Sequence, residues 1–254
     1  MKKFWLASVR ILSLVMVLGL ITGCFVFGVF KYSTTPIEGW VVDEETGKPL
    51  KDVIVVVQWM LYNYKFQVVQ GSSGVLTAME AVTDEKGYFY LPKLGPKTMP
   101  RGSYVLHKSP KLIFFKSGYY WKELSNSPKI FDPDKYPNID RCILSAEKIS
   151  RFNYQVPETH SDWHGKTIKL KIFEDSLEKY AVDLGRINES LVILGLPQTY
   201  CGWKKIPRLV QALEQQRMIF ESANISNILR PLDQIEKNSP KSCGSPHAFF
   251  RSYL

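Results

Sequence analysis

Two apolar, β-branched runs on either side of a polar turn place the strongest constraint on how this chain can fold. Residues 41–59 read VVDEETGKPLKDVIVVVQW. The second run continues as DVIVVVQWMLYNY and is apolar on both faces, which is typical of a strand buried between two layers. Gly47 can adopt a positive φ angle and Pro49 fixes its own φ angle, so a turn is expected between the runs. We therefore predict a hairpin that belongs to a layered β structure.

Further short strands follow at close spacing. The segment TAMEAVTDEKGYFYLP (77–92) turns at DEKG and predicts a second hairpin, and SYVLHKSPKLIFFKSGYY (103–120) holds two more strands. GSSG (71–74) breaks the strand pattern. Five or more strands separated by glycine and proline predict an antiparallel β-sandwich. KTIKLKIF (166–173) alternates apolar and basic residues and predicts an added strand that completes it.

Three segments of this region resemble the carboxypeptidase regulatory-like domain: IEGWVVDEETGKPLKDVIVVV, AVTDEKGYFYLP and LIFFKSGYY. The residues that match the family pattern in order are Ile37, Gly39, Val41, Thr46, Gly47, Pro49, Leu50, Thr83, Asp84, Gly87, Phe89, Gly118 and Tyr119. The resemblance covers about residues 36–122. It implies a transthyretin-like, seven-stranded sandwich in which the first hairpin is scaffold and carries no catalytic group. The aromatic insert QWMLYNYKFQVVQGSSGVLTAME departs from the pattern and predicts a longer hairpin or a surface flap.

The C-terminal part changes to a helical period. Apolar residues recur at alternating spacings of four and three, which predicts a helix of about 20 residues; they are Phe173, Leu177, Tyr180, Leu184, Ile187, Leu191 and Leu194. A second helix is expected to begin near Pro207 and a shorter piece to break at Pro231. The stripe is expected to pack on its own chain, with a coiled-coil dimer as the alternative. The fold class is therefore α+β, with a C-terminal helical hairpin.

The N-terminus carries a membrane signal. MKKFWLASVR is basic, and the following 20 residues, 11–30, have no charge. At 1.5 Å per residue they span about 30 Å, one hydrocarbon thickness, and the basic flank predicts a cytoplasmic N-terminus. Alternatively, ITGC resembles a bacterial lipobox with Cys24 as the lipidated residue, or the segment is a plain secretory signal. All three readings place the folded part outside the cytoplasm, in the periplasm or at the cell surface.

These signals divide the chain into five parts, with a short polar tether between the first two. Residues 1–30 form a membrane anchor or lipoprotein signal segment, and KYSTTP (31–36) is a short polar tether. Residues 36–122 form the sandwich, 123–172 an irregular extension with the added strand, 173–237 the helical region and 238–254 a tail.

Charge and cysteine usage restrict the partners and the compartment. The net charge of +9 fits a surface near anionic phospholipid or cell-wall polymer and does not indicate nucleic acid. We expect membrane lipid as one partner and an envelope protein or polysaccharide as another. The four cysteines have no C-x-x-C spacing, which argues against a thiolate zinc cluster. An oxidising compartment favours a Cys201–Cys243 disulfide, with free buried cysteines as the alternative.

One short segment offers metal chemistry. In HSDWH, His160, Asp162 and His164 would point to the same side of an extended chain, and imidazole with carboxylate can bind zinc. The alternative is a solvated loop in which Asp162 caps a turn. The chain has no G-x-S-x-G motif and no phosphate-binding glycine loop before a Lys-Ser or Lys-Thr pair.

We therefore predict a membrane-anchored binding or structural protein without catalysis and without a cofactor. One alternative is a metal-dependent hydrolase that uses the His-x-Asp-x-His segment. The other is a subunit of an envelope assembly that uses the helical stripe. In the binding hypothesis, Trp59, Tyr62 and Tyr64 of WMLYNYKF would stack on sugar rings or peptide side chains if exposed, whereas core packing is the alternative for the same rings.

Overall fold

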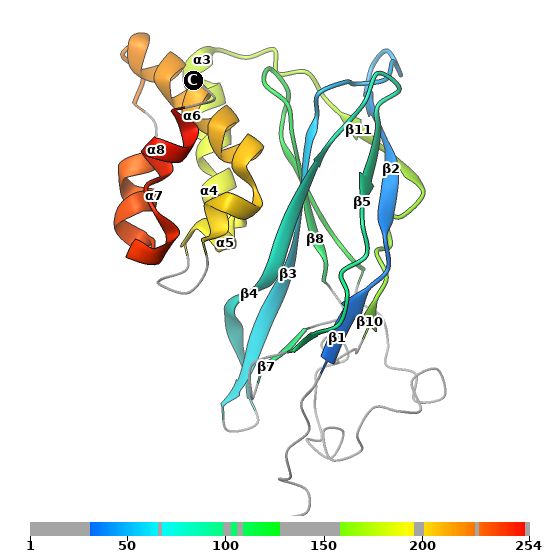
Figure 1. Cartoon of the computed structure of the whole chain (residues 1–254). Helices are drawn as coiled ribbons and strands as arrows, with labels where there is room; N and C mark the ends of the chain where they lie inside the picture. Colours follow the sequence, from blue (N-terminus) through cyan, green and yellow to red (C-terminus); the bar gives the residue numbers. More distant parts are fainter. Residues whose placement is uncertain are drawn as a thin grey trace, which may run out of the picture.

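Two sheets lie face to face, and a group of C-terminal helices covers the outer face of the larger one (Figure 1). This computed structural model describes residues 31–65, 68–98, 103–105, 109–127, 158–195, 201–226 and 229–251. The predicted membrane or signal segment, with Cys24, lies outside these residues. Among the residues that are described, no helix is long and apolar enough to cross a membrane. The chain is a mixed α+β protein, as predicted.

In the part of the chain that the structure describes, three sheets make up the β region. The largest contains β3 (Ile54–Lys65), β4 (Val68–Val82), β7 (Ser103–Val105), β8 (Lys111–Phe115) and β9 (Lys122–Ser125). The sheet opposite it has the order β11-β2-β5, with β2 (Ile37–Asp43), β5 (Tyr88–Leu91) and β11 (Lys166–Leu170). A small sheet at one end joins β1 (Lys31–Thr34) to β6 (Lys97–Thr98) and β10 (Glu158–Thr159).

Both predicted hairpins are instead connections between the two sheets. β2 pairs with β5 and β11, whereas β3 pairs with β4, β7 and β8. The chain first folds back locally, because the Leu50 amide donates to the Val41 carbonyl over 2.9 Å. Asp52, with a φ angle of +60°, then lies where the chain crosses to the opposite sheet. The DEKG turn likewise carries the chain from β4 in one sheet to β5 in the other.

The sandwich is also not wholly antiparallel, contrary to the prediction. β11 runs parallel to β2, with Ile168 opposite Val41, and β10 runs parallel to β1. The added strand predicted from KTIKLKIF therefore exists, but it enters from the same end of the sheet as β2. Alternation alone cannot distinguish these directions, because the side-chain period is the same in both.

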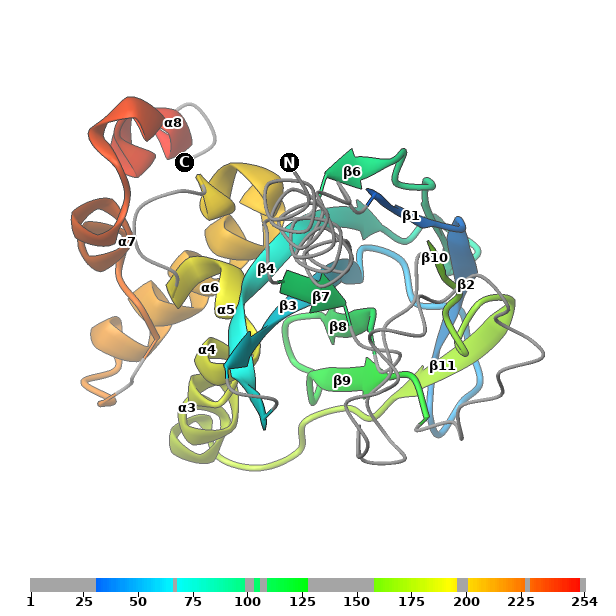
Figure 2. The ribbon, with the colours of Figure 1, turned by 90° about the horizontal axis from the view of Figure 1, so that it is seen from below.

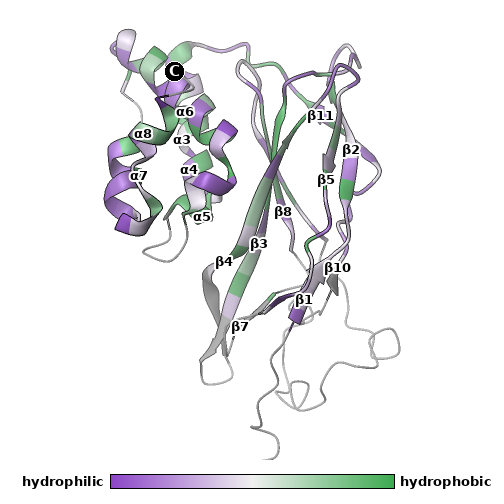
Figure 3. Ribbon diagram, viewed as in Figure 1, coloured by the Kyte–Doolittle hydropathy of each residue, from purple (hydrophilic) through white to green (hydrophobic). Residues whose placement is uncertain are grey.

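Strand β3 contributes to two hydrophobic cores. Val55, Val57, Trp59 and Leu61 point into the core between the two sheets. Val56, Met60 and Tyr62 point to the opposite side, into the core beneath the helices, and Figure 3 shows hydrophobic stretches along β3 beside them. The predicted burial of this strand between layers is confirmed. The aromatic insert forms part of the long β3–β4 hairpin. GSSG does not interrupt the strand as expected but lies within β4, where register shifts accommodate it.

The predicted polar tether is an ordered strand, β1, which we call the stem (Lys31–Thr34). Tyr32 is fully buried, and its hydroxyl bonds to that of Thr159 on β10. The Leu94 amide donates to Thr34 Oγ1 over 2.8 Å, and the Thr34 amide donates to the Leu94 carbonyl over 3.2 Å. The segment looks polar in sequence, but it is ordered because the Tyr32 ring is buried and the hydroxyls of Tyr32 and Thr34 have defined hydrogen-bond partners. The chain therefore joins the sandwich directly at Lys31.

The first predicted long helix is broken into three short ones. These are α3 (Leu177–Gly185), α4 (Ile187–Ser190) and α5 (Val192–Gly195). The chain leaves helical geometry at Leu191, where φ is −85° and ψ is +62°. Gln58 of β3, which is fully buried, donates to the Ser190 carbonyl over 2.9 Å and accepts from the Ile193 amide over 3.2 Å. The break is stabilised because one side chain satisfies backbone groups on both sides of it.

The remaining helices follow the predictions more closely. α6 (Pro207–Ser222) begins at the expected proline, and Pro231 precedes α7 (Leu232–Asn238). The short helix η2 (Gly202–Lys205) lies before α6, and η3 (Lys241–Cys243) and α8 (Pro246–Phe250) occupy the region predicted to be a tail. Phe250 is 2% exposed and packs against Trp203, so this tail is part of the helical core. Cys201 and Cys243, the pair preferred from sequence, form a disulfide that joins the residue before η2 to the last residue of η3.

The helical stripe packs within the chain. Five of its members, Tyr180, Leu184, Ile187, Leu191 and Leu194, are buried against the large sheet and the other helices, whereas Phe173 is half-buried and Leu177 is 37% exposed. Most of the surface suggested for a coiled-coil dimer is therefore occupied by the protein's own core.

Glu80 of β4 caps the start of α6. The amides of Arg208 and Leu209 donate to its two carboxylate oxygens over 2.8 and 3.1 Å. Burial raises the pKa of Glu80 above its ordinary value, and the two amide hydrogen bonds oppose that shift. The contact joins the helices to the sheet through a partly desolvated carboxyl group.

We expect Glu80 to make stability depend on pH. Between the ordinary glutamate pKa and the raised value, the folded state binds more protons than the unfolded state, so the free energy of unfolding falls as the pH rises. The unfolding free energy of wild type minus that of Glu80→Gln should therefore decrease as the pH rises through this window. Urea titrations at a series of pH values measure it, with exposed Glu45→Gln as the control. A difference that does not change with pH would contradict the prediction.

Candidate functional site

The outer face of the β11-β2-β5 sheet carries three aromatic side chains at adjacent positions on two neighbouring strands. Along β2, Ile37, Gly39 and Val41 point into the core, so Trp40 points outward, because side chains alternate along a strand. On β5, Tyr88 and Tyr90 take the outward positions. Trp40 is 39% exposed and Tyr90 is 49% exposed. We call Glu38, Trp40, Tyr88 and Tyr90 the aromatic face.

The strand register fixes the geometry of this face. Trp40 lies opposite Tyr88, and Glu38 lies opposite Tyr90. The Trp40 and Tyr88 ring centroids are 5.6 Å apart with the planes tilted by 53°. The Tyr88 hydroxyl donates to Glu38 Oε2 over 2.7 Å, and this bond is the main reason that the pKa of Tyr88 is raised. A protonated phenol therefore stays bonded to a carboxylate between the two exposed rings.

A polar rim adjoins the rings. The Glu38 amide donates to His164 Nδ1 over 3.4 Å, and the Gly165 amide donates to the Glu38 carbonyl over 2.8 Å. On the same side of β2, β11 places Thr167 opposite Trp40, and Thr167 and the neighbouring Lys169 are exposed. Rings with hydrogen-bonding groups beside them suit a ligand that presents both an apolar face and hydroxyl or charged groups.

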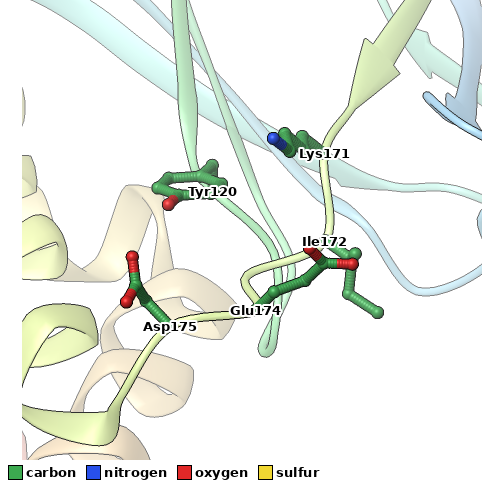
Figure 4. A pocket seen from close by; sticks show the side chains of 5 residues that line it. All are labelled: Tyr120, Lys171, Ile172, Glu174 and Asp175. Atoms are coloured by element: carbon green, nitrogen blue, oxygen red, sulfur yellow. The ribbon is translucent and has the colours of Figure 1, made fainter.

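A small open pocket lies elsewhere, where β11 leads toward α3 (Figure 4). Its volume is about 230 Å³, and it is lined by Tyr120, Lys171, Ile172, Glu174 and Asp175. The Tyr120 amide donates to the Lys171 carbonyl over 2.9 Å, and Asp175 pairs with Lys179 over 2.7 Å. Its lining contains no histidine, cysteine or serine. The aromatic face is therefore the better candidate for a functional surface.

The His-x-Asp-x-His segment does not have the expected extended geometry. Residues 162–165 form a turn, so the three side chains do not share one side. Asp162 accepts from the Ser127 amide over 2.8 Å, and His164 lies against Glu38. Within the described ranges, no three His, Cys, Asp or Glu side chains lie close enough to hold a metal ion.

We expect purified protein to contain no stoichiometric zinc, because the turn at 162–165 does not bring these three side chains to one side and Asp162 and His164 have other partners. Metal analysis by inductively coupled plasma mass spectrometry measures the zinc content, with His247→Ala as a histidine control remote from the segment. One equivalent of zinc that is lost in His160→Ala but retained in His247→Ala would support the hydrolase alternative instead.

The aromatic residues predicted to bind ligand are placed differently. Trp59 and Tyr62 are 1% and 6% exposed, because the opposite sheet covers one face of β3 and the helices cover the other. Tyr64 lies in β3 opposite Val69. Sequence reasoning missed the aromatic face, although the opposite phase of Trp40 in IEGWVVD and the spacing of Tyr88 and Tyr90 were available as signals.

Comparisons with known proteins do not assign the chain to a family. No protein family matches the chain, and no curated protein shows significant similarity to it. Chlorocatechol 1,2-dioxygenase from Pseudomonas putida is 12% identical, with a TM-score of 0.27 over 58% of this chain and 62% of that one. 3-Chlorocatechol 1,2-dioxygenase from Rhodococcus opacus 1CP is 18% identical, with a TM-score of 0.25 over 56% of this chain and 60% of that one. The chain spans less than two thirds of either enzyme, and TM-scores at this level define neither fold nor chemistry.

Proposed function

We propose that this protein is a membrane-anchored, extracytoplasmic binding protein of the bacterial cell envelope without catalytic activity. The observation that carries the binding role is the aromatic face, where Trp40 and Tyr90 remain exposed on a sheet whose other side is fully packed. Two alternatives remain for the anchor: the uncharged segment 11–30 as a membrane helix, or lipidation at Cys24. The mass of the mature N-terminus distinguishes them.

The turn geometry supports a transthyretin-like, carboxypeptidase regulatory-like sandwich. Asp84 Oδ1 accepts from the amides of Lys86 and Tyr88, both over 2.9 Å. Gly87 has a φ angle of +70°, and a Cβ atom there would lie 2.4 Å from the Val41 carbonyl oxygen. The T-D-x-x-G-x-F pattern thus has a structural reason at each of these positions, in agreement with the scaffold role that the resemblance implies.

Two features support an extracytoplasmic location. The Cys201–Cys243 disulfide suits an oxidising compartment. The uncharged segment ends at residue 30, next to the first residue of the stem, so an anchor there would lead straight into the folded part.

The ligand that best fits the aromatic face is a polysaccharide. The rings lie on an open sheet surface, and such a surface matches the repeating apolar faces of sugar rings in a polymer. The Glu38 carboxylate, His164 and Lys169 lie beside the rings and can bond to sugar hydroxyl or acidic groups. An envelope protein is the alternative partner.

We expect Trp40→Ala/Tyr90→Ala to weaken binding to purified cell-wall sacculi by about thirtyfold, at about 1 kcal/mol for each ring. Co-sedimentation of the protein with sacculi measures the affinity, with cellulose as a second polymer. Met218→Ala/Ile219→Ala is the matched control, because these apolar side chains are exposed on α6, 52% and 46% respectively. Equal affinities for the aromatic variant and the control, or no binding of wild type to either polymer, would overturn the polysaccharide proposal.

A further inference from the structure

The two ends of the sandwich carry opposite charge. Figure 1 shows β1, β7 and β10 at one end and the turns after β2 and before β5 at the other, and Figure 2 looks onto the first end. In the described part of the segment that contains β6 and β7, residues 92–98 and 103–105, there are two basic residues, Lys93 and Lys97, and no acidic one. The far turns, residues 43–52 and 84–87, have six acidic and three basic residues. The basic end is the end at which the stem enters.

The described lysines at this end are free to meet a partner. Lys31, Lys93 and Lys97 are exposed, and none of them has an ion pair with another described residue. Lys97 lies opposite Tyr32 in the β1–β6 pair, so it is fixed beside the stem. Glu158 on β10 is the single acidic residue in the three strands of this small sheet.

The stem determines how far this end can be from a bilayer. Its backbone is paired on both sides, with Lys31 opposite Thr98 and Thr34 opposite Thr159. The 20 uncharged residues before Lys31 therefore leave no spacer between the proposed anchor and the sheet. A strand fixed at Lys31 holds the neighbouring lysines within the range of the surface charge of the bilayer, which extends about 10 Å.

We propose that the basic end, Lys31 with Lys93 and Lys97, docks on anionic phospholipid headgroups. Docking through the acidic turns of the far end is disfavoured, because those turns would be repelled if they approached the same surface, so the sandwich stands upright and the aromatic face lies along its side. This inference rests on the proposed membrane anchor. The occupant is lipid because the uncharged chain segment ends at this surface and because the charges are complementary.

Lysine acetylation footprinting of the full chain in nanodiscs tests the docking. We expect Lys31, Lys93 and Lys97 to be acetylated about fivefold more slowly in phosphatidylcholine discs that contain phosphatidylglycerol than in phosphatidylcholine alone. Lys48 and Lys86, in the turns at the far end, are internal controls whose rates should not change. High salt should remove the protection, because the attraction is screened.

A charge-reversal pair separates docking from other causes of protection. Lys93→Glu/Lys97→Glu should abolish the protection of Lys31, whereas Lys48→Glu/Lys86→Glu should leave it intact. Equal acetylation of the basic-end lysines in both kinds of disc, with the chain still embedded, would overturn the docking while the anchor stands. A chain that does not remain in the discs would show instead that the anchor itself is wrong.

Discussion

Replacing Cys201 and Cys243 together by serine is expected to lower the free energy of unfolding by about 4 kcal/mol. The two residues are 42 positions apart, and a cross-link that closes a loop of this length restricts the unfolded chain by about that amount in the chain-entropy description. Urea unfolding under non-reducing conditions measures the change. Reduction of the wild-type protein should produce a similar loss.

The control for this variant is Cys142→Ser, which replaces a cysteine that takes no part in the described disulfide. It leaves the described disulfide in place, so its unfolding midpoint should stay close to that of wild type. If the double serine variant unfolds at the same urea concentration as wild type, the disulfide does not stabilise the helical region. The region that includes η3 and α8 would then be held by contacts such as the one between Trp203 and Phe249, whose ring centroids are 5.1 Å apart.

Gln58→Leu is expected to lower the free energy of unfolding by about 3 kcal/mol. Leucine is similar in size but leaves the Ser190 carbonyl and the Ile193 amide without the partner that Gln58 provides. An unpaired buried backbone group costs about 1–3 kcal/mol. The same urea titration measures the loss, which falls on the junction between the sheet and the helices.

Two further glutamine variants identify the cause. Gln234→Leu on α7 changes an exposed side chain and should have little effect on stability. Gln216→Leu removes one hydrogen bond, to the Ser117 hydroxyl, and should cost about 1 kcal/mol. A Gln58→Leu protein as stable as wild type would mean that the break at Leu191 does not depend on this side chain.

Local patterns in the sequence predicted the positions of strands, turns and helices better than they predicted which strands pair with each other. The two apolar faces of β3, the glycine turns and the proline at the start of α6 all depend on neighbouring residues, and each is found where it was expected. The crossing at Asp52 and the parallel direction of β11 depend on which distant strand is paired, and alternation carries no such information. The break at Leu191 depends on Gln58, a single polar residue in an apolar run that lies more than 130 positions earlier in the chain.

The candidate site shows the same limit. WMLYNYKF is a candidate binding segment in the sequence because its rings are close together. The burial of Trp59 and Tyr62, however, depends on layers contributed by other parts of the chain. The aromatic face could be predicted only by combining the phase of Trp40 on one strand with that of Tyr88 and Tyr90 on another. This requires knowing that β2 and β5 are neighbours.

The sharing of β3 between two cores has a consequence for dissecting the protein. A fragment truncated after β11 would leave Val56, Met60 and Tyr62 facing water, and exposed apolar strands of this kind promote self-association. An isolated helical fragment would expose the apolar side chains that pack on the large sheet in the whole protein. The boundary at residue 173 therefore separates two types of secondary structure within one cooperative folding unit, and both halves should melt in a single transition.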